Sequence, residues 1–475
     1  MTLQVRNPRT GQFDYSIEPA GREALEAAAG ALREAQVRWA ARTPEDRASI
    51  LHRWADAIER DQAAIAAALT VDTGRSTISG IEASAMVQLV RRWADRAPAL
   101  IAEHQRGGCA TSHATITTST TLVPFPLVGV ISPWNFPLTL SLIDAVPALA
   151  AGCAALVKPS EVTPRFVAPL VEATRSVPEI AEVLAFVQGD GATGAALVDV
   201  VDFVCFTGSV PTGRKVAEAA ARAFIPASLE LGGKDPMIVL ASADPERAAA
   251  IALRASIVNT GQACQSIERV YVARAIAEPF LKALVAGAEA VRLNHPDISD
   301  GDIGPFIFEK QARVVQAQID QARAAGAEIL TGGTVETLDG GLYLRPTVIT
   351  GVAPEMAVMA EETFGPVIPV TVVDNDDEAV RLANEGPYGL SAAVIAGSVE
   401  EAEAIGARLQ VGAVSINDGS LTGLVWEAEK TSFGESGLGP SRMGDSGLLR
   451  FLRKRVLIRQ SGEALPLAAY AERRS

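Results

Sequence analysis

Cysteine, histidine and aromatic residues are scarce in this chain of 475 residues. Its four cysteines are widely spaced and form no C-x-x-C pair, which excludes a disulfide framework and leads us to expect a reducing, cytoplasmic environment. The four histidines stand in no recognisable motif, and we predict no metal site. Aromatic residues make up 5%, and with 40 glycines and 27 prolines this indicates an α/β protein with short loops and alanine-rich helices.

Basic residues are outnumbered, because 42 lysines and arginines face 56 aspartates and glutamates and give a net charge of −14. Binding to a phosphate backbone leaves a basic footprint, so nucleic acid is not expected as a partner. No low-complexity tract, heptad array or long repeat occurs, which excludes disordered, fibrous and solenoid classes. The first residues lack a basic segment followed by an apolar one, so no secretory signal is expected.

One long segment lacks charge altogether, since no charged residue stands between His113 and Asp144. Its apolar part, Leu122 to Ile143, has the length of a membrane span. Four prolines within 14 positions would break such a helix repeatedly and leave amides that lipid cannot satisfy. We therefore predict no membrane contact, and we assign the segment to a strand, a turn and a buried helix.

Apolar residues make up 48% of a chain that is longer than one hydrophobic core usually serves, so at least two domains are expected. After an alanine-rich helical layer over Glu18–Leu69, apolar strands alternate with helices, the pattern of a parallel sheet covered on both faces. The first series has predicted strands at Leu127–Ile131, Ala154–Lys158, Val183–Gln188, Phe203–Thr207 and Ala227–Leu231, with helices at Leu140–Ala151, Val167–Ser176 and Val216–Ala223. The second has predicted strands at Met237–Leu240, Arg269–Val272, Leu344–Ile349, Val367–Val373, Ala392–Ile395 and Ala413–Ile416, with a helix at Glu309–Ala324.

Two segments lie outside these series. The threonine-rich stretch Ala110–Thr121 predicts a solvent-facing hairpin. The last 26 residues, from Arg450, carry seven basic and two acidic side chains, with a predicted strand at Arg455–Gln460. This end is either a solvated tail or, as we favour, a strand that pairs with a neighbouring subunit.

Cys264 differs from the other cysteines in its surroundings. Cys153 and Cys205 are embedded in apolar runs, which is typical of buried structural cysteines. Cys264 follows Gly261 among short polar residues, where a thiolate can face a cleft. No histidine offers a recognisable partner, so a carboxylate is the expected base for this nucleophile.

Glu230 supplies a carboxylate at the end of an apolar strand, directly before Gly-Gly. An acidic side chain is costly to bury there unless its charge is used, although a strand-end salt bridge with Lys234 explains it equally well. Asn135 stands between two aromatics and two prolines in the segment PWNFP. Its amide is suited to donate to an oxyanion, and a turn-forming asparagine is the simpler alternative.

Two glycine-containing loops are candidates for phosphate binding. Gly189–Gly194 matches G-x-G-x-x-G after a strand, but no strand about 20 residues on ends in a convincing ribose-binding acid. Phe206–Gly213 opens a helix with Gly-Ser and offers free amides and a hydroxyl, so we favour it for a pyrophosphate. Lys158 and Glu161, in KPSE at another strand end, suit ribose hydroxyls or form a simple charged turn.

Taken in order, the segments PWNFP, KPSE, FTGS, LELGGK, GQAC and ETFGP resemble the aldehyde dehydrogenase superfamily over nearly the whole chain, with Glu230 preceding Cys264 by 34 residues. The resemblance implies an α/β fold with a Rossmann-like NAD-binding domain (1–104 and 125–232) and a second α/β catalytic domain (233–434). It also implies a small β oligomerisation element (105–124 and 450–475) and a homodimer or homotetramer.

The same resemblance implies oxidation of a small-molecule aldehyde to the carboxylic acid with reduction of NAD(P). Cys264 would attack the aldehyde to give a thiohemiacetal whose oxyanion is held by the Asn135 amide and the Cys264 N–H. Loss of hydride would leave a thioester, which water hydrolyses with Glu230 as the base.

For the cofactor, the resemblance implies Lys158 and Glu161 at the adenosine ribose and Ser209 at the pyrophosphate. A carboxylate at Glu161 would repel a 2′-phosphate, so NAD is the preferred cofactor, with NADP possible. The complete set of implied cofactor-binding residues is Trp134, Lys158, Glu161, Gly191, Gly208, Ser209, Leu231, Glu362 and Phe364.

One segment departs from the family pattern G-G-x-K-x-S-G-x-G-R-E, because Thr431–Gly444 reads TSFGESGLGPSRMG and has Gly434 at the usual lysine position. The segment adjoins the substrate entrance in relatives. Gln265 and Ser266 beside the nucleophile offer no anchor for an anionic substrate, which favours a neutral aliphatic or aromatic aldehyde. An apolar entrance is predicted from Phe136, Trp426 and Phe433.

Two other functions remain open. In a CoA-acylating semialdehyde dehydrogenase a thiol would replace water, and the base Glu230 would then be superfluous. In a catalytically silent binding or structural protein on the same scaffold, Cys264, Glu230 and Asn135 would not be needed together.

Overall fold

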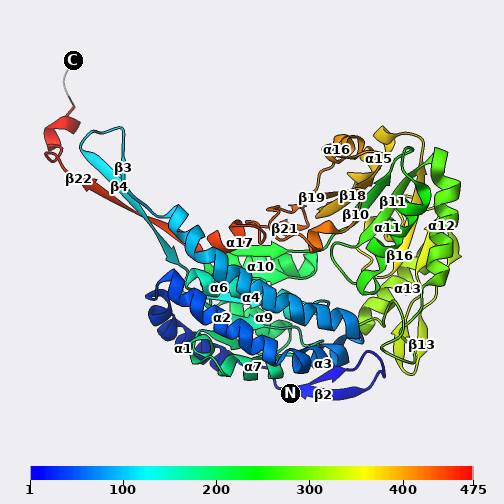
Figure 1. The fold of residues 1–475 in the computed structure, drawn as a ribbon, viewed down its shortest axis with the longest axis horizontal. Coiled ribbons are helices and arrows are strands. Elements are labelled where there is room, and N and C mark those ends of the chain that lie inside the picture. Colours follow the sequence, from blue (N-terminus) through cyan, green and yellow to red (C-terminus); the bar gives the residue numbers. More distant parts are fainter. Residues whose placement is uncertain (1, 473–475) are drawn as a thin grey trace.

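The computed structural model describes residues 2–472, and residues 473–475 at the end of the predicted C-terminal element lie outside it. Two α/β bodies lie side by side, and a β arm extends from the first of them (Figure 1). Each body contains its own central sheet, so the predicted mixed α/β fold is confirmed.

The first body is built on a six-stranded sheet in the order β21-β9-β8-β5-β6-β7. All neighbours are parallel except the short β21, and β5, β6 and β8 are buried along their whole length. The strands are β5 (Leu127–Ile131), β6 (Ala154–Lys158), β7 (Leu184–Phe186), β8 (Phe203–Thr207), β9 (Ala227–Glu230) and β21 (Gly437–Leu438). Continuous apolar runs therefore became buried parallel strands, as predicted.

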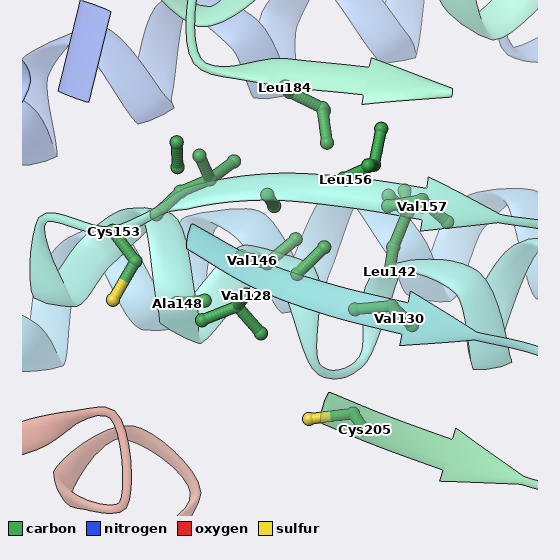
Figure 2. Packing of buried hydrophobic residues seen from close by; sticks show 14 of the residues in the cluster. Val128, Val130, Leu142, Val146, Ala148, Cys153, Leu156, Val157, Leu184 and Cys205 are labelled. Carbon is green, nitrogen blue, oxygen red and sulfur yellow. The ribbon is translucent and has the colours of Figure 1, made fainter. Parts of the chain in front are cut away.

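Helices cover both faces of this sheet. They are α1 (Arg22–Ala40), α2 (Pro44–Arg60), α3 (Gln62–Thr73), α4 (Ser76–His104), α5 (Pro137–Leu142), α6 (Ala145–Ala151), α7 (Val167–Arg175), α8 (Pro178–Ala181), α9 (Gly191–Val198) and α10 (Val210–Ala223). The 29-residue α4 was not predicted, and the single helix predicted over 140–151 is divided into α5 and α6. Figure 2 shows the core between these layers, which includes Cys153 and Cys205.

The second body is built on a seven-stranded sheet in the order β12-β15-β16-β11-β10-β18-β19, parallel except for β12. Its strands are β10 (Asp235–Val239), β11 (Ile267–Ala273), β12 (Glu328–Thr331), β15 (Thr347–Thr350), β16 (Val367–Val373), β18 (Ser391–Ile395) and β19 (Ala413–Ile416). Its helices are α11 (Pro245–Ile257), α12 (Ala277–Ala290), α13 (Glu309–Ala324), α14 (Ala357–Ala360), α15 (Asp376–Ala383) and α16 (Val399–Gly406). The predicted boundary at 232/233 lies between β9 and β10 and stays a prediction.

Smaller elements connect or decorate the bodies. They are β1 (Leu3–Arg6), β2 (Phe13–Ile17), β13 (Glu336–Leu338), β14 (Gly341–Tyr343), β17 (Tyr388–Gly389), β20 (Phe433–Gly434), α17 (Ser446–Leu449) and the 3₁₀ turns η1 (Val258–Gly261), η2 (Arg274–Ile276), η3 (Leu421–Gly423) and η4 (Leu467–Tyr470). No helix within residues 2–472 is both long and apolar enough to cross a membrane.

The arm is a three-stranded antiparallel sheet of β3 (Arg106–Ala110), β4 (Ile116–Pro124) and β22 (Leu452–Gln460). The predicted hairpin and C-terminal strand are both present, although the observed partner of β22 is β4 of the same chain, from Leu452 opposite Pro124 to Gln460 opposite Ile116. Pairing of β22 with a neighbouring subunit stays a prediction for its other edge.

Candidate active site

A cavity of about 120 Å³, here called the first cavity, lies where the carboxyl ends of β5, β8 and β9 meet two loops of the second body. Crevices at the carboxyl ends of parallel strands are the usual ligand sites of α/β folds. The first cavity is lined by Pro133, Trp134, Asn135, Leu140, Thr207, Gly208, Ser209, Leu231, Gly232, Cys264, Gln311, Glu362 and Phe364. It therefore brings together Cys264, Asn135 and six of the residues predicted to bind the cofactor.

Cys264 lies in the loop between η1 and β11 and is partly accessible, whereas Cys153 and Cys205 are fully buried. The loop passes close to the segment that carries Glu362 and Phe364, because a Cβ on Gly261, which has a φ of +69°, would lie 2.3 Å from Gly365. Desolvation raises the pKa of the Cys264 thiol to about 12, and the carboxylates of Glu362 and Glu230 act in the same direction. The resting thiol is thus protonated and needs a base before it attacks.

Lys430 is a charged residue near the thiol that the sequence analysis missed. Its ammonium opposes the carboxylates and acts to lower the pKa of Cys264. It stands in the segment after η3, which no motif marked, so only the three-dimensional fold brings it to the nucleophile.

The Asn135 side chain is buried and precedes α5. Its amide nitrogen donates to the Gln262 carbonyl at 3.0 Å, which uses one of its two N–H groups. Its backbone carbonyl accepts from Arg75 at 3.0 Å and from Asn259 at 3.1 Å. The amide is therefore fixed against the loop that carries Cys264, with one N–H left for a ligand in the first cavity.

Glu230 ends β9 beside the first cavity, next to Leu231 in its lining. Its carboxylate accepts from the Ser432 hydroxyl at 3.3 Å and lies 4.0 Å from Nε of Arg442. The alternative of a salt bridge with Lys234 is wrong, because the ammonium of that lysine pairs with Glu268 instead.

Lys234 instead forms a buried ion pair with Glu268, at 2.8 Å. Its ammonium also donates to the Thr363 hydroxyl at 2.8 Å, and the Glu268 carboxylate accepts from the N–H groups of Thr363 and Phe364 at 2.8 and 2.7 Å. The pair thereby fixes the loop that presents Phe364 to the first cavity. Neither role was predicted, although Lys234 is the last residue of the motif LELGGK and Glu268 stands four residues after Cys264 of GQAC.

Glu362 faces the first cavity from the same loop. It accepts from the Gly233 N–H at 3.1 Å, and a Cβ on Gly232 would lie 2.6 Å from its carboxylate. Burial and the neighbouring charge of Glu268 raise the pKa of Glu362 above its ordinary value. The absence of a side chain at Gly232 keeps this carboxyl group close to the cavity.

The remaining predicted residues lie along the same sheet edge, outside the lining of the first cavity. Lys158 is buried at the end of β6 and donates to the Pro159 carbonyl at 3.1 Å and to Glu161 at 3.2 Å. Gly191 begins α9, whose first N–H groups, those of Ala192 and Thr193, donate to the Asp190 carboxylate. By contrast, no side chain caps α10 after Ser209, and Ser209 lines the first cavity. Phosphate binding at this second loop stays a prediction.

A second cavity, of about 460 Å³, adjoins the first through Arg442, which donates to the Thr207 hydroxyl at 2.6 Å. It is lined by Leu89, Arg92, Trp93, Arg96, Ile143, Trp426, Glu427, Glu429, Arg442, Gly444 and Asp445. The predicted apolar entrance stays a prediction. Of its three residues, Trp426 lines the second cavity, whereas Phe433 pairs with β17 and the Phe136 ring lies against Arg75. The charged side chains Arg92 and Arg96 in this lining come from α4, which was not predicted.

Comparison with known proteins agrees with this geometry. The model of the aldehyde dehydrogenase family matches residues 1–457. This chain belongs to the aldehyde dehydrogenase family. It is 36% identical over 451 residues to a protein of Mycolicibacterium smegmatis named putative succinate-semialdehyde dehydrogenase (NADP+), covering 94% of this chain and 87% of that protein.

Two solved structures extend the likeness to the fold. A putative aldehyde dehydrogenase, PutA, from Anabaena variabilis has a TM-score of 0.96 and 51% identity, covering 98% of this chain and 99% of that one. Betaine aldehyde dehydrogenase from Staphylococcus aureus in complex with NAD+ has a TM-score of 0.92 and 29% identity, covering 98% and 93%. The protein is an NAD(P)-dependent aldehyde dehydrogenase.

The residues of the first cavity fit a nicotinamide dinucleotide. The open N-terminus of α10 suits a pyrophosphate, and the Glu362 carboxyl group beside side-chain-free Gly232 suits a ribose. The Trp134 ring packs against Phe308 and Phe364, with centroids 5.8 and 5.5 Å apart, and provides an aromatic wall. Within residues 2–472 no cluster of three or more His, Cys, Asp or Glu side chains could hold a metal ion.

Proposed function

We propose that this aldehyde dehydrogenase oxidises a neutral aldehyde to the free carboxylic acid through a covalent intermediate on Cys264. The observation that carries the proposal is the first cavity, in which a partly accessible thiol and an amide with one uncommitted N–H share a lining with the dinucleotide-binding residues. Glu230 beside that cavity supplies the hydrolytic base.

In the first half-reaction, the thiol of Cys264 passes its proton to Glu230, and the sulfur attacks the aldehyde carbon. The carbonyl oxygen becomes an oxyanion, to which the Asn135 amide and the Cys264 N–H donate. When bound, the nicotinamide ring accepts the hydride that leaves the former aldehyde carbon. A thioester on Cys264 remains.

Before the second half-reaction, Glu230 releases to solvent the proton that it took from the thiol. It then takes a proton from water, and the resulting hydroxide attacks the thioester carbon. The C–S bond breaks, the carboxylic acid is released, and the Cys264 thiolate takes the proton from Glu230, which restores both groups. The overall change consumes one aldehyde, one oxidised dinucleotide and one water, and yields the acid, the reduced dinucleotide and one proton.

The second cavity supports a neutral substrate. Three cationic side chains, Arg92, Arg96 and Arg442, face three anionic ones, Glu427, Glu429 and Asp445, so the lining favours neither sign of charge. We propose that the aldehyde's side chain occupies this cavity, next to Trp426, while the dinucleotide occupies the first.

NAD is the proposed cofactor. The Glu161 carboxylate lies beside Lys158 and partly neutralises its positive charge, which would otherwise attract a 2′-phosphate. Comparable catalytic efficiency with NADP would overturn this preference.

We also propose that the arm joins subunits into a homodimer or homotetramer. Val456, Leu457 and Ile458 are consecutive exposed apolar residues on β22, and an edge strand of this kind favours pairing with another chain. Light scattering after size exclusion tests this, and a monomer at micromolar concentration would contradict it.

The test of function is NADH formation over a panel of neutral, anionic and cationic aldehydes, with and without CoA. We expect free acid as the product and no dependence on CoA. Cys264→Ala should abolish NADH formation but retain dinucleotide binding, while Cys109→Ser, in the arm, should retain activity. Acyl-CoA without free acid would favour the CoA-acylating alternative, and silence across the panel would favour the binding-protein alternative.

A further inference from the structure

A buried charge cluster lies directly behind Glu230. Asp144, at the start of α6, accepts from Arg442 at 3.0 Å and from Arg450 on its other oxygen. Arg450 also donates to Ser228 at 2.8 Å, and Ser228 stands two residues before Glu230 on the same face of β9. The cluster is thus fixed to the strand that carries the proposed base.

The charges of this cluster do not balance without Glu230. Two guanidinium groups share one carboxylate, and all three side chains are at most 8% exposed. Both arginines act to lower the pKa of Asp144, which keeps it ionised despite its burial. The cluster therefore has a net charge of about one positive unit, and Glu230 is the carboxylate that Arg442 faces next.

One polar atom of the cluster has no hydrogen-bond partner within residues 2–472, the buried Nε of Arg442. The Nη2 atom of the same guanidinium is occupied by Asp144 and Thr207. Nε lies 4.0 Å from Glu230, close enough for charge attraction but beyond a hydrogen bond. A buried N–H without an acceptor is costly, so a small movement of Glu230 toward it is favoured.

We propose that Arg442 is the positioning residue for Glu230. Its guanidinium attracts the Glu230 carboxylate and fixes the place from which that carboxylate takes a proton from water during thioester hydrolysis. This inference rests on the proposed function, in which Glu230 is the base of the second half-reaction.

The charged and titratable groups around Glu230 come from several segments of the chain. Arg442 reaches it from the loop before α17, Cys264 from the loop before β11, and Asp144 with Arg450 lies behind Arg442. Glu362 lies across the thiol, with Lys430 opposing it. Among these cations Arg442 alone stands within 4.0 Å of the Glu230 carboxylate in the described part of the chain, so its removal should have the largest effect.

The experiment separates the two half-reactions in the holoenzyme. With NAD and a neutral aldehyde that the panel identifies, the NADH burst reports acylation, and intact mass after rapid quenching reports loss of the acyl group. We expect Arg442→Gln to retain the burst and to slow loss of the acyl group by about 10- to 100-fold, because a misplaced catalytic group costs rate on this scale.

Three further variants make the result specific. Arg442→Lys keeps the charge and should hydrolyse the acyl group at close to the unchanged rate, and Arg450→Gln removes a cation from the same Asp144 but should slow hydrolysis clearly less. In an E230Q background, Arg442→Gln should cause no further slowing. Thermal unfolding of each variant reports folding, and if Arg442→Gln is unfolded the Lys variant carries the test, where hydrolysis slowed by more than about tenfold overturns the inference.

The outcomes distinguish this inference from the proposed function. If E230Q alone hydrolyses the thioester at the full rate, the proposed base is wrong and the inference fails with it. If E230Q is slow but Arg442→Gln leaves the hydrolysis rate unchanged, or Arg450→Gln lowers it equally, only the inference is overturned.

Discussion

The two cavities on either side of the contact between Thr207 and Arg442 are built from different kinds of sequence. The first is assembled from short loops that follow buried parallel strands, each with its own motif. The second is assembled from the middle of α4 and from the segment between η3 and α17, more than 300 residues away. Local motifs therefore predict the cofactor side, whereas the substrate side depends on long-range packing.

The ion pairs of the two cavities also differ. Lys234 and Glu268 fix a loop of the first cavity, and Arg96 and Asp445 line the second. Lys234 and Glu268 are 2% and 3% exposed, whereas Arg96 and Asp445 beside the second cavity are 36% and 46% exposed. Breaking a buried pair leaves an uncompensated charge in a desolvated site, while an exposed pair is screened by solvent. The first cavity should therefore depend much more strongly on its ion pair.

The largest expected effect comes from Lys234→Met. It should lower the free energy of unfolding by about 3–5 kcal/mol, because Glu268 is left buried without its cation. The matched variant Arg96→Met should lower it by less than about 1 kcal/mol. Denaturant unfolding of both variants measures the difference, and equal losses would remove the contrast.

Asn135→Ala should lower turnover by about 10²–10³-fold, the usual effect of removing one oxyanion donor. The dissociation constant for NAD should change little, because this amide faces the Cys264 loop rather than the α10 N-terminus. Steady-state kinetics and fluorescence titration of NADH measure both quantities. Loss of NAD affinity in proportion to turnover would assign Asn135 to cofactor binding instead.

Alkylation of Cys264 by iodoacetamide should accelerate about tenfold per pH unit between pH 7 and 10. The pKa of this thiol is raised to about 12, so the reactive thiolate is a small fraction that grows with pH throughout this range. A Cys109→Ser background leaves Cys264 as the accessible thiol among the described residues. A rate that levels off below pH 9 would show that the thiol is more acidic than its surroundings indicate.

Trp426→Ala should raise the KM for the aldehyde about fivefold, with the KM for NAD unchanged. The Arg92 guanidinium lies over the Trp426 ring, 4.9 Å from the ring centroid. Of the two cavities, Trp426 lines only the second. Kinetics with each substrate varied in turn measure this. A rise in the KM for NAD alone would exchange the roles of the two cavities.

The structure also explains where sequence reasoning succeeded. Strands such as β5, β6 and β8 carry continuous apolar runs with a glycine or proline nearby, so their bounds were predicted to the residue. α4 was not predicted, because its buried face shares the helix with Pro98 and several exposed charges, which weakens the periodic signal.

The candidate site divides in the same way. Cys264, Asn135 and Glu362 stand in motifs, and their convergence followed from those motifs. Lys430 and Arg442 stand outside recognisable motifs. The pairing of Lys234 with Glu268 rather than Glu230 depends on how two separate segments pack together in the fold. Nothing in the local sequence specifies that packing.

The most direct test of the central claim is intact mass spectrometry of the Glu230→Gln variant after mixing with NAD and an oxidisable aldehyde. We predict an added mass equal to the acyl group, located on Cys264 by peptide mapping and absent from the Cys264→Ala/Glu230→Gln double variant. An unmodified Cys264 while NADH is formed, or the same adduct in the double variant, would contradict the account.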